Sequence, residues 1–241
     1  MKSGGWDTKV FEPWDAPPGQ KAYKGGNLPG IRSKLDYLCD LGINAIYLTP
    51  IFSSPTYHRY KPIDFYAVDR LLGGNKEFKL LLNECQHRNI HLILDGVFNH
   101  VGIAFPPFQD VIEYGAASPW RNWFHIESFP VNPYEGLKPR NFRGWNGNRT
   151  MPELNHANPG VREFVMRVAE HWVRKGIDGW RFDHPQNMNL PGFWEELRSR
   201  LKHINPNVYL VGELWTDASP WLNGNQWDAV MNYPLMGAIH R

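Results

Sequence analysis

Three acidic side chains stand where apolar runs of the sequence end. Asp95, Asp183 and Glu213 each close a short apolar run, and Arg181 precedes Asp183 by two positions. In parallel α/β folds, polar residues at the carboxyl ends of strands line the site. One carboxylate alone is more often a helix cap or part of a turn. Three in succession, with an arginine beside one of them, favour a site that carries out chemistry.

Arg181 and Asp183 differ from Glu213 in the protonation that we expect. Residues two apart on a strand share a face, so the guanidinium is expected to lower the pKa of the Asp183 carboxyl and keep it anionic. A structural salt bridge is the alternative for this pair. Glu213 follows an apolar run and precedes Leu214 and Trp215, where partial burial is expected to raise its pKa and keep it protonated. One ionised and one protonated carboxyl is the pattern of glycoside cleavage.

Alternating strands and helices are expected to position these groups. Apolar runs predict strands at 44–50, 91–97, 178–183, 208–213 and 227–231. Helical spacing predicts helices from Ile31 to Leu41, from Asn75 through Cys85, from Asn158 to Gly176, and over about 191–203. Five strands with four crossover helices indicate βαβ units and a parallel sheet. The chain is therefore either an open doubly wound sheet or part of a (β/α)8 barrel.

Two segments fall outside this alternation. Residues 1–30 contain repeated Pro and Gly and predict a loop. Residues 101–157 are rich in Pro, Gly, Asn, Trp and Phe and show no clear helix pattern. A long insertion after a strand is more often an active-site lobe than a structureless loop, so we predict such a lobe here.

Composition excludes several classes of function. The net charge of +2, from 26 Lys and Arg against 24 Asp and Glu without a basic run, argues against a nucleic-acid partner. No segment approaches the roughly 18 consecutive apolar residues of a membrane span. The first residues lack the apolar centre of a signal peptide, so a cytoplasmic protein is expected. Cys39 and Cys85 lie far apart in helix patterns and predict neither a disulfide nor a metal site. The 14% of aromatic residues suits a ligand with stacking faces, such as a sugar.

Several motifs of the chain occur in an order that is typical of one enzyme family. The three strand-end motifs are Asp95-Gly96-Val97-Phe98-Asn99-His100, Gly179-Trp180-Arg181-Phe182-Asp183 and Gly212-Glu213-Leu214-Trp215. They resemble signature regions of the alpha-amylase family of glycoside hydrolases, and the segment 42–50 is similar to that family's second barrel strand. Met151-Pro152-Glu153-Leu154-Asn155, with the segments 23–28 and 51–55, points to the neopullulanase and cyclomaltodextrinase branch. The resemblance covers nearly the whole chain.

The resemblance implies a fold and an activity. The fold is an incomplete TIM (β/α)8 barrel with about strands two to six and an inserted lobe after strand three. The implied domains are a barrel part over 1–100, the lobe over 101–157 and a second barrel part over 158–241. The activity is retaining hydrolysis of α-linked glucans, namely maltooligosaccharides, cyclodextrins, starch or pullulan.

The same resemblance implies roles for single residues. Asp183 is the nucleophile that attacks the anomeric carbon, and Glu213 protonates the leaving oxygen and later activates water. Arg181 orients Asp183. The sugar at the cleaved position is bound by Tyr60 and His100, of which Tyr60 stacks under the ring. Asp95 and Asn99 are structural and shape the end of their strand.

The sequence departs from the family pattern in two places. The family's third carboxylate, an Asp that follows an Asn-His pair, has no counterpart after Glu213, and the first barrel strand is missing. We therefore expect a fragment that is weak or inactive by itself. The residues after Asp183 are His184-Pro185-Gln186-Asn187, where the family has a small residue first and His or Glu fourth. The sequence therefore does not decide whether a structural calcium is bound. No cofactor and no catalytic metal is expected.

Three other interpretations stay open. The chain is a glucanotransferase, or it is a remnant of the same fold that binds carbohydrate or a protein partner without catalysis. A third interpretation is a metal-dependent hydrolase that uses Asp95, His100 and Asp183, although no spacing such as HExxH supports it. The resemblance also leaves open a homodimer of the full-length form.

Overall fold

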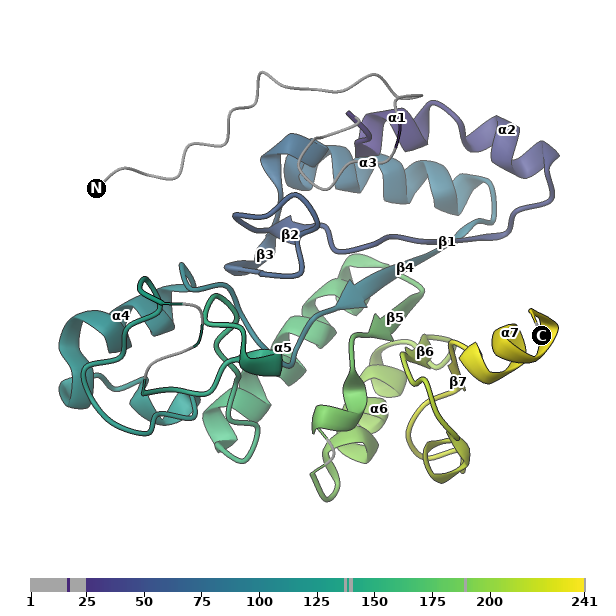
Figure 1. Cartoon of the computed structure of the whole chain (residues 1–241). Coiled ribbons are helices and arrows are strands. Elements are labelled where there is room, and N and C mark those ends of the chain that lie inside the picture. The colour runs from purple at the N-terminus through teal and green to yellow at the C-terminus, as the bar shows by residue number, and fades with distance from the viewer. Residues whose placement is uncertain (1–16, 18–24, 137, 139–140, 189, 241) are drawn as a thin grey trace.

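Five parallel strands form the main sheet of the molecule. The computed structural model describes residue 17 and residues 25–136, 138, 141–188 and 190–240. The sheet has the order β1-β4-β5-β6-β7 (Figure 1). Its strands are β1 (Ala45–Tyr47), β4 (His91–Gly96), β5 (Gly179–Phe182), β6 (Tyr209–Gly212) and β7 (Ala229–Val230). All five predicted strands are confirmed, each shorter than its apolar run.

The strand order decides between the two predicted architectures. Each strand pairs in parallel with the strand that precedes it in this sheet. A doubly wound sheet reverses its order at a switch point, whereas a (β/α)8 barrel adds its strands in sequence. The sheet is therefore a part of a TIM barrel, as predicted.

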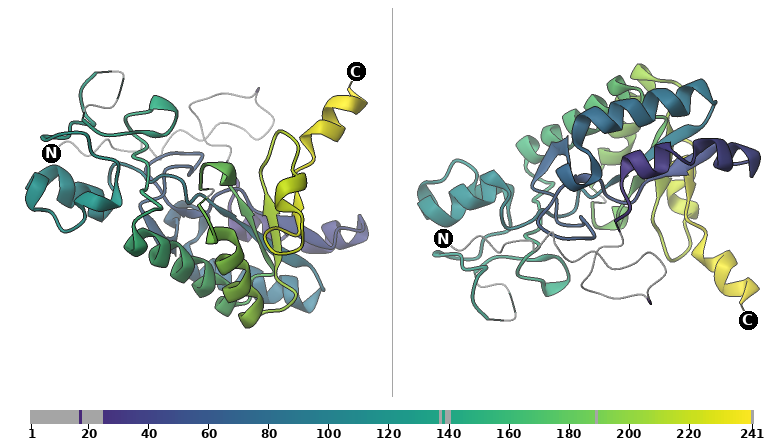
Figure 2. Two further views of the ribbon diagram at one scale, coloured as in Figure 1. Left: turned by 90° about the horizontal axis from the view of Figure 1, so that it is seen from below. Right: turned by 90° about the horizontal axis from the view of Figure 1, so that it is seen from above.

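Helices cover one face of this sheet. They include α3 (Gly74–His87), α5 (Pro159–Lys175) and α6 (Phe193–Ile204), which lie on the same side of the strands (Figure 2). The boundaries of α5 follow local chemistry: the Asn158 side chain accepts hydrogen bonds from the amides of Gly160 and Val161, and Gly176 ends the helix with φ at +102°. The predicted third and fourth helices are thus confirmed.

The other predicted helices need correction. The pattern from Ile31 to Leu41 forms two short helices, α1 (Leu28–Arg32) and α2 (Leu35–Asp40), because the Ser33 hydroxyl donates to the Gly30 carbonyl and the chain turns there. Both precede β1, so they are not a crossover connection. Asn75 does not cap α3, which begins after Gly73. Its side chain instead accepts from the Val68 amide, 2.7 Å away.

A hairpin, three short 3-10 helices and one further α-helix were not predicted. An antiparallel hairpin of β2 (Phe52–Ser53) and β3 (Asp64–Val68) follows β1. The 3-10 helices η1 (Arg70–Leu72), η5 (Pro185–Met188) and η6 (Ser219–Trp221) lie in connections between strands. Helix α7 (Tyr233–Ile239) follows β7.

The segment 101–157 contains a helix, contrary to the prediction. Helix α4 (Pro106–Tyr114) starts with two prolines, a composition that the first helical turn accepts. It is followed by η2 (Gly115–Ala117), η3 (Arg121–Trp123) and η4 (Trp145–Gly147). Phe108 of α4 packs against the rings of Phe124 and Phe142, with ring centroids 4.9 and 5.2 Å away. The predicted domain boundaries stay predictions.

The apolar core lies between the sheet and the helices. Leu94, Trp180 and Leu210 are register partners on β4, β5 and β6, and each is at most 1% exposed. Adjacent residues of a strand point to opposite faces, so Asp95 and Arg181 lie on the other face. Sequence alternation thus assigns one face of the sheet to packing and the other to polar groups.

Three further predictions concern particular segments. Cys39 lies on α2 and the buried Cys85 on α3, as predicted. None of the helices described here has the length and apolarity that crossing a membrane requires. Most of the loop predicted for residues 1–30 falls outside the described residues, as do residues 23 and 24 of the motif at 23–28. The described end of this loop, from Leu28 on, belongs to α1.

Candidate active site at the carboxyl ends of the strands

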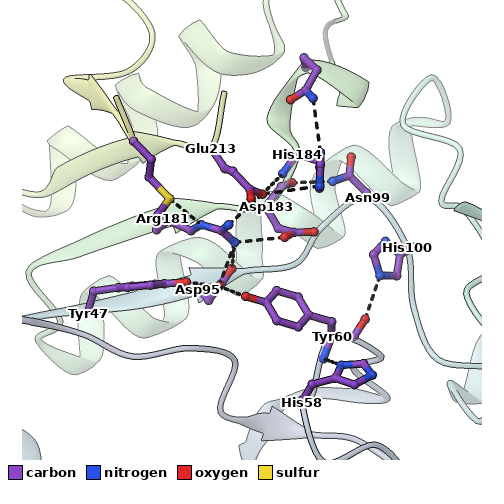
Figure 3. Close-up of polar contacts among 12 residues, drawn as sticks. Tyr47, His58, Tyr60, Asp95, Asn99, His100, Arg181, Asp183, His184 and Glu213 are labelled. Carbon is purple, nitrogen blue, oxygen red and sulfur yellow. Dashed lines mark hydrogen bonds and ion pairs between the residues drawn. The ribbon is translucent and has the colours of Figure 1, made fainter. Parts of the chain in front are cut away.

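The register of β4, β5 and β6 brings the predicted site residues together. Asp95 lies opposite Arg181. Phe182 and Gly212 are also register partners, and the residues that follow them are Asp183 and Glu213. The four polar side chains therefore gather at one end of three adjacent strands, as Figure 3 shows. The predicted meeting of the three carboxylates is confirmed.

Arg181 contacts all three carboxylates. Its Nη1 lies 2.9 Å from both oxygens of Asp95 and 3.0 Å from Oδ1 of Asp183. Its Nη2 lies 2.8 Å from Oε2 of Glu213. All four residues are buried. The guanidinium fork therefore fixes the relative positions of the carboxylates, because each of its contacts is a charge-assisted hydrogen bond with a preferred direction.

Backbone contacts hold the strand ends at this spacing. The Asp183 amide donates to the Gly96 carbonyl over 3.1 Å, and the Glu213 amide donates to the Phe182 carbonyl over 3.0 Å. A Cβ at Gly212 would lie 2.5 Å from the ring of the buried Trp227. The residue before Glu213 must therefore be glycine for β6 to pack this closely.

A hollow of about 320 Å³ opens over these carboxylates. It combines acidic, imidazole and aromatic side chains, which suits a polar ligand with flat faces. Its lining residues are His58, Tyr60, His100, Trp145, Met151, Arg181, Asp183, His184 and Glu213. All five residues predicted to react with or bind the sugar are among them.

Tyr60 and His100 are positioned by each other and by their neighbours. The Tyr60 hydroxyl lies 3.3 Å from Oδ2 of Asp95. His100 is buried, its Nε2 donates to the Tyr60 carbonyl over 2.8 Å, and its ring stacks on Trp145 with centroids 5.0 Å apart. Burial lowers the pKa of His100 to about 4. The imidazole is therefore a neutral hydrogen-bonding group at neutral pH.

Asp95 and Asn99 support the site from behind the hollow. Asp95 receives the Arg181 guanidinium together with the hydroxyls of Tyr47 and Tyr60. Asn99 donates from Nδ2 to the carbonyl of Asp183 over 2.5 Å. Neither residue lines the hollow. This placement fits the structural role that the resemblance implies for both.

The direction of the pKa shift expected for Asp183 is wrong. Burial raises the pKa of Asp183 to about 7, and the charges of Asp95 and Glu213 add to this effect, which outweighs the opposing charge of Arg181. Burial likewise raises the pKa of Asp95. One guanidinium shared by three buried carboxylates leaves an excess of negative charge, which favours binding of a proton. The protonation expected for Glu213 stays a prediction.

Three site residues were missed from the sequence. The Tyr47 hydroxyl donates a hydrogen bond to Asp95. Tyr47 lies in a predicted strand, and because neighbouring strand residues point to opposite faces, the sequence could have placed it on the polar face. His184 lies over Glu213, with Nε2 at 3.8 Å from Oε2. Trp145 lies between His100 and His184, at 5.0 and 5.1 Å from their rings. No local pattern marks Trp145, because only the fold of the segment 101–157 brings it to the hollow.

A second hollow lies behind Trp145 and Asn99. It measures about 360 Å³ and is also lined by Asn187, the fourth residue after Asp183. Among the described residues, the buried Oδ1 of Asn99 has no hydrogen-bond partner. Amide oxygens are ligands that Ca²⁺ accepts, and Asn99 and Asn187 both line this hollow. The structural calcium stays a prediction.

A parallel barrel sheet whose strand ends hold acidic groups around an arginine defines a protein of the (β/α)8 class with its site at the usual end of the strands. Comparison with known proteins then identifies the family. The model described as alpha amylase, catalytic domain, matches residues 7–240. The chain belongs to the alpha-amylase family.

Named relatives agree with the predicted branch of that family. Cyclomaltodextrinase of Geobacillus thermopakistaniensis (strain MAS1) is 45% identical over 236 residues, which are 97% of this chain and 39% of that protein. Neopullulanase 2 of Thermoactinomyces vulgaris is 42% identical over 98% of this chain and 40% of its own length. The crystal structure of the debranching enzyme of Nostoc punctiforme superposes with a TM-score of 0.85 at 55% identity and covers 91% of this chain and 45% of that one. The chain thus spans less than half the length of these relatives.

Proposed function

We propose that this chain carries the nucleophile and the acid/base of a retaining glycoside hydrolase that acts on α-linked glucans. The observation that carries the proposal is the contact of Arg181 with Asp95, Asp183 and Glu213 on the floor of the hollow. Glycoside cleavage passes through a transition state with positive charge at the anomeric carbon. A fixed excess of carboxylates at that point stabilises the developing charge without reorganisation.

Geometry supports the division of roles between two carboxyls. Asp183 and Glu213 each place an oxygen within 4.8 Å of the other. Retaining enzymes hold their carboxyl groups about 5–5.5 Å apart, whereas inverting enzymes leave about 6.5–9.5 Å for a water molecule. In this proposal Asp183 attacks the anomeric carbon and Glu213 protonates the leaving oxygen. Arg181 orients Asp183 as it does in the free protein.

The rest of the hollow supports sugar binding. Tyr60 presents an aromatic ring close to Asp95, and Trp145 adds a second aromatic group that stacks on His100. Aromatic faces stack on the apolar faces of sugars, and the neutral imidazole of His100 hydrogen-bonds hydroxyl groups. The names of the relatives, a cyclomaltodextrinase and a neopullulanase, support cyclodextrins and pullulan as substrates. A cytoplasmic location, the absence of nucleic-acid and membrane partners, and a homodimer of the full-length form stay predictions.

Turnover by the 241-residue chain alone is proposed to be slow. Tyr47 and Tyr209, on the face of the sheet that carries the site, are 37% and 44% exposed. Aromatic surface that is exposed beside a site marks a face that further chain covers. The site is therefore proposed to need additional chain over this face for full activity.

The test compares the wild-type chain with Asp183→Asn and Glu213→Gln. Prolonged incubation with maltoheptaose and chromatography of the products measures turnover, and calorimetry measures binding. We expect slow hydrolysis by the wild type and a loss of at least about 10³-fold in both variants, since each removes a reacting group. Hydrolysis that survives Asp183→Asn would exclude the nucleophile assignment. Binding of maltoheptaose by the wild type without any product would favour a non-catalytic carbohydrate-binding protein.

A further inference from the structure

A mixed cluster of ligand groups lines the active-site hollow. Asp183, His184 and Glu213 each offer one ligand atom, and these atoms lie within 4.8 Å of one another. Two of the three residues are the proposed catalytic carboxylates. The third is His184, which directly follows Asp183 in the chain.

We propose that Asp183, His184 and Glu213 bind a borderline divalent cation such as Zn²⁺. Two carboxylates and one imidazole are the ligand types of zinc sites that keep a fourth position for water. Hard cations such as Mg²⁺ and Ca²⁺ prefer oxygen ligands alone.

The distances are close to those that zinc requires. Bonds of about 2.0–2.2 Å to nitrogen and oxygen place the ligand atoms of a tetrahedral site about 3.4 Å apart. Nε2 of His184 lies 3.8 Å from Oε2 of Glu213. Arg181 contacts Oδ1 of Asp183 and Oε2 of Glu213, and each carboxylate has a second oxygen as an additional ligand atom. Small side-chain rotations therefore bring the three groups to bonding distance.

The backbone at His184 supports this assignment. His184 has φ at +40°, a left-handed conformation that is uncommon for residues other than Gly, although Asn, Asp and His adopt it more often than the rest. This conformation follows directly on Asp183 and sets the imidazole beside Trp145, over Glu213. A strained residue at a site is retained where the surrounding structure holds it, and such residues cluster at ligand-binding positions.

Gln186 supplies the second observation that points to a metal ligand. Its terminal amide lies 3.4 Å from Nδ1 of His184, and its buried Oε1 has no hydrogen-bond partner among the described residues. Rotating this amide by 180°, an assignment that the amide shape alone does not fix, lets Oε1 accept from Nδ1–H. Histidines that bind metals almost always donate their other ring N–H in this way. The resulting tautomer leaves the lone pair of Nε2 facing Glu213.

Charge favours a cation at this point as well. Asp95, Asp183 and Glu213 together face one guanidinium, which leaves two negative charges when all three carboxylates are ionised. A divalent cation balances them. Zinc bound there would occupy the two carboxylates proposed for glycoside cleavage and exclude the glucan. This consequence rests on the proposed function, whereas the binding itself does not.

Calorimetric titration of the chelator-treated chain with Zn²⁺, and visible absorption with Co²⁺, test the proposal without any measurement of activity. We expect one ion per chain and a loss of affinity of at least tenfold in His184→Asn, whose side chain accepts the positive φ. Gln186→Leu is expected to weaken binding about 10-fold, because it removes the group that orients the imidazole. The matched control is His203→Asn, an exposed histidine of α6, which should bind as the wild type does.

Three results would overturn the proposal. They are failure of the folded wild type to bind either ion, unchanged affinity in both His184→Asn and Gln186→Leu, and an equal loss in His203→Asn. Far-UV circular dichroism establishes that each variant is folded. If His184→Asn does not fold, the affinity of Gln186→Leu decides the outcome, because Gln186 orients the imidazole without binding the ion itself.

Discussion

The two faces of the central sheet differ in what their side chains do. On the face covered by α3, α5 and α6, the row Leu94–Trp180–Leu210 is excluded from water. On the opposite face, the row Asp95–Arg181–Val211 carries three charged contacts and lies beside exposed tyrosines. Burial of apolar surface stabilises the first face, whereas the second buries charges that repel one another. Stability and function are thus separated by the alternation of single residues along each strand.

The largest expected effect is on the covered face. Trp180→Ala removes a side chain that is fully buried and whose indole nitrogen donates to the Ala169 carbonyl. We expect the free energy of unfolding to fall by about 3–5 kcal/mol, because the change leaves a cavity in a packed core. Urea unfolding measures it. Tyr209→Ala on the open face is the control and should change stability by no more than about 0.5 kcal/mol. Equal losses in the two variants would contradict the difference between the faces.

A buried histidine is expected to make the covered side sensitive to acid. His156 donates from Nε2 to the Phe98 carbonyl over 2.7 Å and packs against Phe193 of α6. Burial lowers its pKa to about 4, whereas the unfolded chain binds the proton at about 6.5. Between these values the unfolded state holds more protons, so stability decreases as pH falls from 6.5 to 4.

The size of this loss of stability follows from the lowered pKa of His156. About 1.4 kcal/mol per pH unit gives a loss of about 3 kcal/mol across that interval. Urea unfolding at several pH values should show a smaller slope in His156→Gln than in the wild type. His87→Gln, at an exposed position of α3, is the control and should leave the slope unchanged. A slope that is the same in His156→Gln would show that another group is responsible.

The smallest expected change in stability is on the polar face of the sheet, and it is a gain instead of a loss. Asp183→Asn removes one of three carboxylates that share Arg181. Because the removed charge repels its neighbours, we expect the variant to be more stable than the wild type at neutral pH by about 1 kcal/mol, although it loses activity. Thermal unfolding measures this gain. A clear loss of stability would mean that the attraction between Asp183 and Arg181 outweighs the repulsion between Asp183 and the other two carboxylates.

The parts of the site that lie within one strand could be predicted from the sequence. Arg181 and Asp183 are two residues apart, and their shared face follows from strand geometry alone. The meeting of the three carboxylates followed from the strand ends, whereas their sharing of one guanidinium did not, and this is why the direction of the pKa shift expected for Asp183 was wrong. The sequence shows the arginine that lowers its pKa. The burial that raises it most, and the charges of Asp95 and Glu213 that add to this effect, depend on how β4 and β6 pack and pair with β5.

The fold was predicted to a similar extent. Long apolar runs and capped helices such as α5 gave correct elements, because their signals are local. Helix α4 was missed, since its two initial prolines and aromatic residues resemble a loop composition. Trp145 was missed for a different reason. Its position beside His100 depends on contacts of the whole segment 101–157, which no spacing in the sequence expresses.

The paired register of β4 and β5 has a consequence for how the site is assembled. A slip of one residue would turn the carboxylate of Asp95 toward the helices, against Trp180, and leave it without its arginine. Desolvating an unpartnered carboxylate among apolar side chains is far more unfavourable than losing one backbone contact. The apolar interior therefore selects, during folding, the alignment of strands in which Arg181 can contact the carboxylates.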